Sequence, residues 1–213
     1  MSRGVESRPE TKRRRGVQKA IFLNVPGDLR LRISPADFER LCPENRDLRL
    51  ERTAKGRLII MSPASARSGG RNAILTMRLV LWAIADGTGK AFDSSAGFTL
   101  PNGAVYASDA SWVVSERWNA LTDDQQDVGF SPLCPDFVVE LRSRTDRIRE
   151  LRDKLAEYID QGARLGWLID PKAGVVEVYR PGRAVEVLKQ PATLSGEAVL
   201  PGFVLDLKGI LDE

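Results

Sequence analysis

Apolar residues in this chain form short strand-like runs and longer helical stripes, and turn residues separate them. The pattern predicts helices over residues 34–41, 71–86 and 146–161, with residues 62–70 as a mobile loop before the second helix. It predicts strands over residues 48–52, 57–61, 90–93, 97–100, 109–114, 137–141, 165–169, 175–179 and 185–188. Helices that frame several strands indicate a mixed α/β fold with one central sheet.

Two charged side chains interrupt this pattern at positions that are expected to be buried. Glu140 lies inside the apolar strand-like run of residues 137–141. Lys154 lies in the apolar stripe of the third helix, next to Leu151 and Leu155. A lone buried charge costs several kcal/mol and is normally kept only when it is paired, hydrogen-bonded or bound to a metal. The two residues therefore mark a candidate site.

Composition narrows the chemistry that such a site can perform. The 213 residues are 42% hydrophobic, which is enough for one sizeable core. There is no run of about 18 apolar residues and no apolar leader, so we expect a cytoplasmic protein that does not enter a membrane. Cys42 and Cys134 have no metal-ligand spacing and are expected to be reduced structural thiols. Histidine is absent, which excludes histidine-based nucleophile systems and histidine zinc ligands.

Positive charge is concentrated at the N-terminus. Residues 1–19 hold seven basic and two acidic side chains, a net of +5, so the rest of the chain carries −2 of the total of +3. We expect residues 1–20 to be a basic, disordered tail and residues 21–213 to form the domain. The run from Lys12 to Arg15 is either an arm that contacts nucleic-acid phosphates or a solvated tail without a dedicated role.

A second group of arginines surrounds the start of the third helix and is offset by acidic neighbours. It is either a solvated helix face or a phosphate track. Its members are Arg142, Arg144, Arg147, Arg149 and Arg152.

Two carboxylates are expected to converge in the sheet. Asp109 begins one strand and Glu140 lies inside another, and neighbouring strands are about 4.8 Å apart. Mg²⁺ suits two such ligands, because it combines one or two carboxylates with water and phosphate oxygens. Asp136 is the competing partner, but four strand residues separate it from Glu140 by roughly 13 Å. We therefore rank Asp109 above Asp136 as the second metal ligand.

Basic and phenolic side chains follow on the same elements. Arg142 lies two residues after Glu140 on the same strand face, but arginine does not release a proton near neutral pH and is a poor general base. Lys154 is expected to supply the amine instead, and Tyr158 points the same way one turn later. Each residue also has a structural reading: Glu140 as a paired core carboxylate, Lys154 as a side chain that reaches solvent, and Asp109 as a turn residue.

Four segments of the chain, in this order, resemble the Uma-type family of bacterial putative restriction endonucleases, part of the PD-(D/E)XK nuclease superfamily. They are residues 108–113 (SDASWV), 134–143 (CPDFVVELRS), 154–158 (KLAEY) and 166–171 (GWLIDP). The resemblance covers roughly residues 30–210. It implies a single-domain αβββαβ nuclease core, with a central mixed sheet flanked by helices, and Mg²⁺-dependent phosphodiester cleavage with Mn²⁺ as the alternative ion.

The resemblance also implies roles for individual residues. Asp109 and Glu140 match the metal-binding acidic positions, and Lys154 and Tyr158 match the Q-x-x-x-Y-like positions of the following helix. Glu51 in the hairpin matches an upstream acidic residue. Two departures are visible: Arg142 stands where the superfamily has lysine, and Ser62-Pro63 is not followed by the histidine that some relatives carry.

The sequence thus predicts a Mg²⁺-dependent DNA endonuclease. Its expected catalytic residues are Asp109, Glu140 and Lys154, supported by Arg142, Tyr158 and Glu51. Cutting two strands with a single-site domain requires two copies or rebinding, so a homodimer is one expected assembly. The first alternative is an inactive nucleic-acid-binding module of the same fold, and the second is a metal-dependent hydrolase of another phosphate ester.

Overall fold

The computed structural model describes residues 31–212, which belong to one compact unit, Leu31–Glu213. The basic tail, the Lys12 to Arg15 run and the domain boundary expected at residue 20 lie outside the described residues. The helices are α1 (Pro35–Glu44), α2 (Ala66–Asp86), α3 (Ser115–Asn119), α4 (Asp123–Asp127) and α5 (Ile148–Asp160). The strands are β1 (Arg49–Arg52), β2 (Leu58–Met61), β3 (Gly89–Asp93), β4 (Phe98–Thr99), β5 (Val105–Tyr106), β6 (Ala110–Val114), β7 (Phe137–Leu141), β8 (Leu165–Asp170), β9 (Val175–Tyr179), β10 (Glu186–Lys189), β11 (Thr193–Ser195) and β12 (Val204–Asp206).

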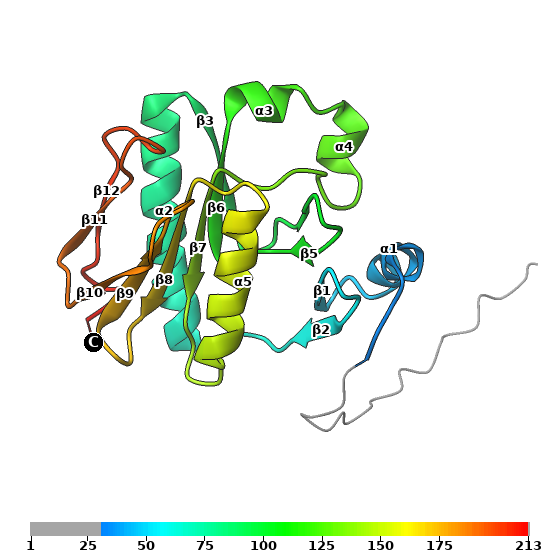
Figure 1. Cartoon of the computed structure of the whole chain (residues 1–213), viewed down its shortest axis with the longest axis horizontal. Helices are drawn as coiled ribbons and strands as arrows, with labels where there is room; N and C mark the ends of the chain where they lie inside the picture. The colour runs from blue at the N-terminus through cyan, green and yellow to red at the C-terminus, as the bar shows by residue number, and fades with distance from the viewer. Residues whose placement is uncertain (1–30, 213) are drawn as a thin grey trace, which may run out of the picture. The chain divides into compact units, whose positions relative to one another are not determined.

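A six-stranded mixed sheet lies at the centre, in the order β10-β9-β8-β7-β6-β3 (Figure 1). Its neighbouring strands are antiparallel except for β7 and β8, which run parallel. Two parallel strands cannot be joined by a hairpin, so the chain between them must cross over a face of the sheet. Helix α5 is that crossover and packs on both strands.

Side chains of β7 alternate between two helices that cover opposite faces of this sheet (Figure 1). Val139 packs in one core cluster with Leu75 of α2, and Val138 packs in another with Leu155 of α5. Because both faces are covered, all five residues of β7 are buried. Alternation turns Glu140 to the same face as Val138, beneath α5.

The second helix begins earlier than the hydrophobic pattern predicted. α2 starts at Ala66, and Ser65 caps it by accepting a hydrogen bond from the backbone amide three residues later at 3.2 Å. The prediction of a loop over residues 62–70 is therefore wrong for residues 66–70, which are helical. A side-chain cap satisfies a free backbone donor of the first turn, which offsets the low helix propensity of the two glycines that follow.

The hairpin of β1 and β2 does not join the central sheet and lies in a separate sheet that the sequence pattern did not predict. It belongs to a four-stranded sheet in the order β2-β1-β5-β4, and Phe38 of α1 packs against this sheet through Leu50 and Val105. The short strands β4 and β5 come between β3 and β6 in the chain. Asp109 consequently lies in the connection from the smaller sheet to the central one.

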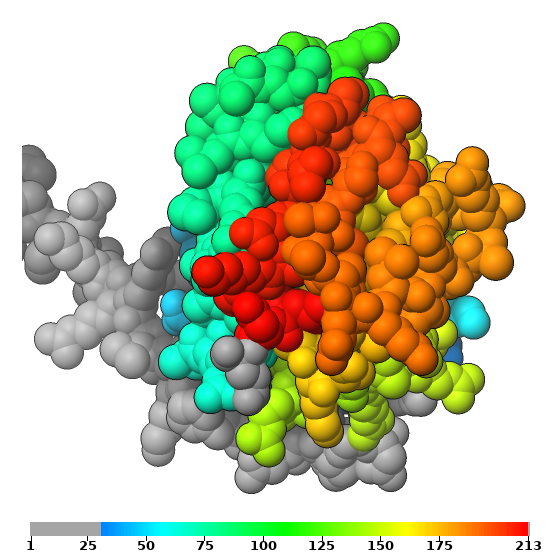
Figure 2. All heavy atoms as spheres, turned by 90° about the vertical axis from the view of Figure 1, so that its left-hand side faces the viewer, coloured from blue at the N-terminus to red at the C-terminus, as the bar shows by residue number. Residues whose placement is uncertain are grey.

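The last part of the chain lies against α2. Strands β11 and β12 form a two-stranded sheet, and Leu194 and Leu205 join the core cluster that contains the buried face of α2. Arg78 of α2 donates a hydrogen bond to the carbonyl oxygen of Lys208 at 2.9 Å. Figure 2 shows this orange to red segment beside the green-cyan helix.

Two simpler expectations concern membranes and cysteines. Within residues 31–212, no helix has the length and apolar character needed to cross a membrane. Cys42 and Cys134 are free thiols, as predicted, and Cys134 is buried.

The space around Gly89 and Gly70 predicts opposite effects for alanine substitutions at these two positions. A methyl group at Gly89 would overlap the ring of Trp112 and the carbonyl oxygen of Val113, so we expect Gly89→Ala to destabilise the protein by about 1–3 kcal/mol. Gly70 is exposed in α2 with open space around its Cα, and Gly70→Ala is expected to stabilise by about 0.5–1 kcal/mol. Urea unfolding measures both, and a Gly89→Ala protein as stable as the wild type would contradict this packing.

Candidate active site

The ammonium group of Lys154 lies at the centre of a buried cluster of charges. Its Nζ is 2.8 Å from Oε1 of Glu140 and 2.9 Å from Oε1 of Glu51. It also donates a hydrogen bond to the carbonyl oxygen of Ala107 at 2.9 Å. The three charged side chains are only 3–9% exposed. A lysine ammonium has three N–H donors; here it donates hydrogen bonds to Glu51 and Ala107 and forms an ion pair with Glu140.

The two-residue repeat of the strands and the 3.6-residue repeat of the helix turn these side chains toward one another. Glu140 faces α5 because it alternates with Val139, and Lys154 lies on the buried side of α5 one turn before Tyr158. Glu51 alternates with Leu50, which packs toward α1, and so faces the other way. The separate sheet that contains β1 thus supplies one carboxylate, and the central sheet supplies the other.

Asp109 is hydrogen-bonded to the two residues of β7 that flank Glu140. Its backbone amide donates to the carbonyl oxygen of Val139 at 3.0 Å, and its Oδ2 accepts a hydrogen bond from the backbone amide of Leu141 at 2.8 Å. The metal-site hypothesis required the strands of Asp109 and Glu140 to be neighbours, and β6, which begins directly after Asp109, does pair with β7. The shared role of Asp109 and Glu140 as metal ligands stays a prediction.

Asp136, the competing carboxylate, is held at the opposite end of β7. Its Oδ2 accepts a hydrogen bond from the backbone amide of Val114 at 3.0 Å, and its Oδ1 forms an ion pair with Arg117 at 2.9 Å. Both carboxylate oxygens thus have structural partners away from Lys154. This position agrees with ranking Asp109 above Asp136.

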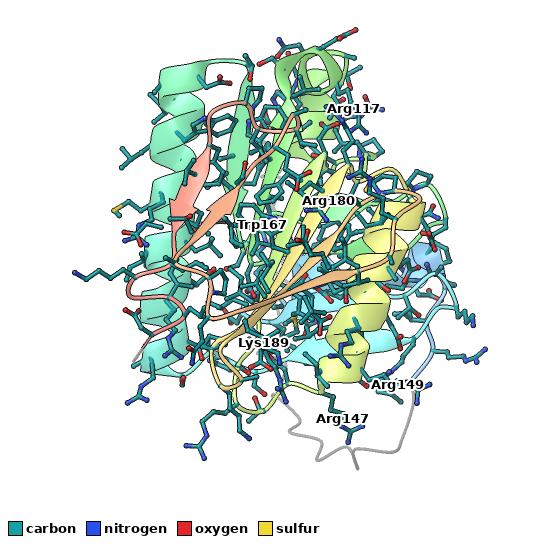
Figure 3. The ribbon with its side chains drawn as sticks, turned by 60° about the vertical axis from the view of Figure 1, so that its left-hand side comes forward. Arg117, Arg147, Arg149, Trp167, Arg180 and Lys189 are labelled. Carbon is teal, nitrogen blue, oxygen red and sulfur yellow. The ribbon has the colours of Figure 1, made fainter. Side chains whose placement is uncertain are left out.

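Arginines near α5 fall into two groups. Arg142 forms an ion pair with Asp170 at 2.6 Å, and Arg152 pairs with Glu177. These two arginines neutralise buried carboxylates of β8 and β9 and form no ion pair with the carboxylates around Lys154. The exposed members, which form no ion pair with any residue between 31 and 212, are Arg144, Arg147 and Arg149. Figure 3 shows Arg147 and Arg149 extending outward from the start of α5.

Two tyrosines line the cluster. Tyr158 is fully buried, and its ring centroid lies 5.7 Å from that of Tyr106. The Lys154 ammonium lies 5.4 Å from the Tyr106 ring centroid, which is close enough for a cation–π interaction. Burial, followed by the charges of Glu140 and Glu51, raises the pKa of Tyr158 well above its usual value, so this phenol stays protonated. Tyr106 and the carbonyl group of Ala107 were not predicted, because only the docking of β1 and β5 beside α5 brings them here.

Charge balance shifts the pKa values of the cluster. Burial raises the pKa of Glu140 to about 8; Lys154 opposes this shift, and the charges of Asp109 and Glu51 add to it. Burial lowers the pKa of Lys154, but Glu140 and Glu51 more than offset this, so the ammonium stays charged. Burial also raises the pKa of Asp109, against the Leu141 amide and the Lys154 charge. Three ionised carboxylates and one ammonium would leave a net charge of −2.

The donor set fits a divalent cation that prefers oxygen ligands. One oxygen of each carboxylate is already engaged, Oδ2 of Asp109 by Leu141 and Oε1 of Glu140 by Lys154. The other oxygens, Oδ1 of Asp109 and Oε2 of Glu140, accept no hydrogen bond from residues 31–212. No group of three or more histidine, cysteine or acidic side chains in this range is arranged to hold a metal. A Mg²⁺ ion bound here would keep several water ligands, as Mg²⁺ usually does.

Known proteins resemble this chain in sequence and in fold. The model of the Uma2 family, described as "Putative restriction endonuclease", matches residues 35–208, in agreement with the motif resemblance. A crystal structure of a putative nuclease belonging to DUF820 from Anabaena variabilis has a TM-score of 0.65 and 18% identity, over 76% of this chain and 89% of that chain. At this identity the match shows a shared fold, which confirms the mixed α/β prediction. No curated protein matches the sequence.

The raised pKa of Glu140 predicts how stability depends on pH in the absence of metal. Its pKa is about 8 in the folded protein against 4.5 when solvated, so between these values the folded state binds more protons than the unfolded state. Stability should therefore fall as pH rises from 4.5 to 8, by at most about 1.4 kcal/mol per pH unit from this group. Glu140→Gln should remove this contribution and be the more stable protein above pH 8.

Urea unfolding in EDTA between pH 5 and pH 9 measures this dependence. Glu39→Gln on the exposed surface of α1 is the matched control and should keep the wild-type dependence. If Glu140→Gln and the wild type lost stability equally across this range, the raised pKa would be excluded.

Proposed function

The chain belongs to the Uma2 family, described as "Putative restriction endonuclease", and from this premise we propose that it is a Mg²⁺-dependent DNA endonuclease. The observation that carries the proposal is the pair Asp109 and Glu140. Asp109 is hydrogen-bonded to both residues that flank Glu140 on β7, and each carboxylate keeps one oxygen that accepts no hydrogen bond from residues 31–212. Such a pair is the ligand set expected for a metal that assists phosphodiester hydrolysis.

Asp109 and Glu140 would hold the metal. When bound, Mg²⁺ would polarise a phosphate oxygen and lower the pKa of a coordinated water. The backbone amide of Leu141 and the Lys154 ammonium fix one oxygen of each carboxylate, so the remaining oxygens are oriented before the metal arrives. Fixed ligands of this kind reduce the reorganisation needed at the moment of reaction.

Lys154 acts in this proposal as a fixed cation. Its raised pKa keeps it protonated, so it does not remove a proton from water. It orients Glu140 and stabilises negative charge that develops at the phosphate. Glu51 supports it from β1, since the same Oε1 atom accepts from Lys154 and from the backbone amide of Ala107.

DNA as substrate and a homodimer as assembly belong to the same proposal. The family description supports DNA, because restriction endonucleases cut DNA. One site cuts one strand at a time, so cleavage of both strands would use two copies of the chain. Mn²⁺, which shares the oxygen-ligand preference of Mg²⁺, is the alternative ion.

An inactive nucleic-acid-binding module of the same fold is the second candidate. One observation favours it: the three donors of Lys154 already face three protein acceptors, so the ammonium neutralises the cluster without a metal. In that case the buried charges only stabilise the junction between the two sheets.

A pair of matched Asp→Asn variants tests the metal ligands. Asp109→Asn should lower Mg²⁺-dependent nicking of supercoiled plasmid at least about 100-fold, because it removes a ligand charge. Asp136→Asn changes the same group at the opposite end of β7 and should still cut DNA, despite losing its ion pair with Arg117. Calorimetric titration with Mg²⁺ should show weakened binding for Asp109→Asn only. Wild-type cleavage by Asp109→Asn would exclude this residue from the site.

A second pair of variants tests whether Lys154 has a catalytic or only a structural role. Lys154→Met and Arg152→Met each remove a cation of α5 that pairs with a buried carboxylate. Lys154→Met should cost about 3–5 kcal/mol of stability, and Arg152→Met less, because the Arg152 side chain is 53% exposed. Per folded molecule, Arg152→Met should cut at the wild-type rate and Lys154→Met should lose cleavage. If both variants cut equally well, Lys154 has only a structural role.

A further inference from the structure

Arg49 lies beside the candidate site on the same strand as Glu51. It is the first residue of β1, two positions before Glu51, and alternation places both on one side of the strand. The intervening Leu50 points to the opposite side, where it packs with Phe38 of α1. The side chain of Arg49 therefore extends from the side of β1 on which Glu51 contacts Lys154.

The guanidinium of Arg49 has no partner among the residues that the structure describes. Its Nη2 is buried and makes no hydrogen bond, and the side chain forms no ion pair within residues 31–212. Other sheltered arginines differ. Arg52 donates to two backbone carbonyl oxygens, at 3.0 Å and 2.8 Å, and Arg142 pairs with Asp170. A buried N–H without an acceptor is energetically unfavourable. Such a group is explained by a ligand that binds there or by local strain.

The pairing of β1 with β5 agrees with a position near Asp109. Arg52 lies opposite Val105 in this antiparallel pair, so the residues that follow β5 toward Asp109 run beside the start of β1, where Arg49 lies. Arg49 nevertheless forms no ion pair with Asp109 or with any other residue between 31 and 212. Its guanidinium therefore has no acceptor among the described residues.

We propose that Arg49 binds the phosphate of the substrate, donating hydrogen bonds to its non-bridging oxygens beside the metal that Asp109 and Glu140 would hold. The proposal deepens the proposed function and rests on it for the identity of the substrate. A phosphate is the anion of choice, because the planar guanidinium offers paired donors that match two phosphate oxygens. Arginine does not release a proton near neutral pH, so Arg49 contributes binding and charge stabilisation and no proton transfer.

Arg49→Ala is the main test, with Arg46→Ala as the matched control. Arg46 is exposed and lies three residues earlier, outside β1, so its removal changes the net charge equally. Arg49→Ala should lower kcat/KM for Mg²⁺-dependent cleavage by roughly 100-fold, as removal of one stabilising donor does in other enzymes. Arg46→Ala should leave cleavage unchanged. Millimolar guanidinium chloride, far below denaturing concentrations, should partly restore cleavage by Arg49→Ala and not affect the wild type.

DNA binding in Ca²⁺ separates this proposal from the proposed function. Fluorescence anisotropy with a short labelled duplex should show weaker binding by Arg49→Ala, and its slope of log K against log salt should be shallower by about 0.9. If the wild type binds DNA but does not cut it, the endonuclease proposal fails. The binding data alone then decide whether Arg49 contacts phosphate. If Arg49→Ala binds and cuts as the wild type does, the Arg49 proposal is overturned. A wild-type protein that binds no DNA overturns both.

Discussion

The structure depends on one buried ammonium group. Lys154 contacts the carboxylates of Glu51 and Glu140 and the carbonyl oxygen of Ala107, which belong to three different parts of the chain. A buried ionised carboxylate without a cation is unfavourable by several kcal/mol, so Lys154 stabilises both glutamates in this interior. The four-stranded sheet and the central sheet are therefore held in register with α5 by charge as well as by apolar contacts.

The balance of positive and negative charges distinguishes the Lys154 cluster from the neighbouring ion pairs. Along the same face of the sheet, Asp170 and Glu177 are each matched by one arginine, Arg142 and Arg152. Around Lys154 there are more carboxylates than ammonium groups, and burial raises the pKa of both Glu140 and Asp109. Balanced pairs need no further partner, whereas an excess of negative charge in a sheltered place favours an additional cation. This imbalance is the physical basis for proposing a metal here and not at the arginine pairs.

Much of this arrangement follows from local sequence patterns. The mixed α/β fold, the position of Glu140 within a buried strand and that of Lys154 on the buried side of a helix follow from periods of two and 3.6 residues. The start of α2 was mispredicted, because a serine cap outweighed two glycines. Tyr106 and Ala107 carry no local signal of a site, since the docking of a second sheet brings them to Lys154. The metal-binding and catalytic roles of Asp109, Glu140 and Lys154 stay predictions.

The residues of the Lys154 cluster lie far apart in the sequence, which determines when the cluster can form during synthesis of the chain. Glu51 and Lys154 are 103 residues apart in the chain, and α5 is made after every strand that supplies a carboxylate to the cluster. A ribosome-bound chain that ends before α5 contains the acidic side chains but lacks the ammonium that orders them. The complete arrangement exists only once the crossover helix has been made and has docked between the two sheets. Incomplete copies of the protein are thus expected to lack the ordered carboxylates that the proposed metal site needs.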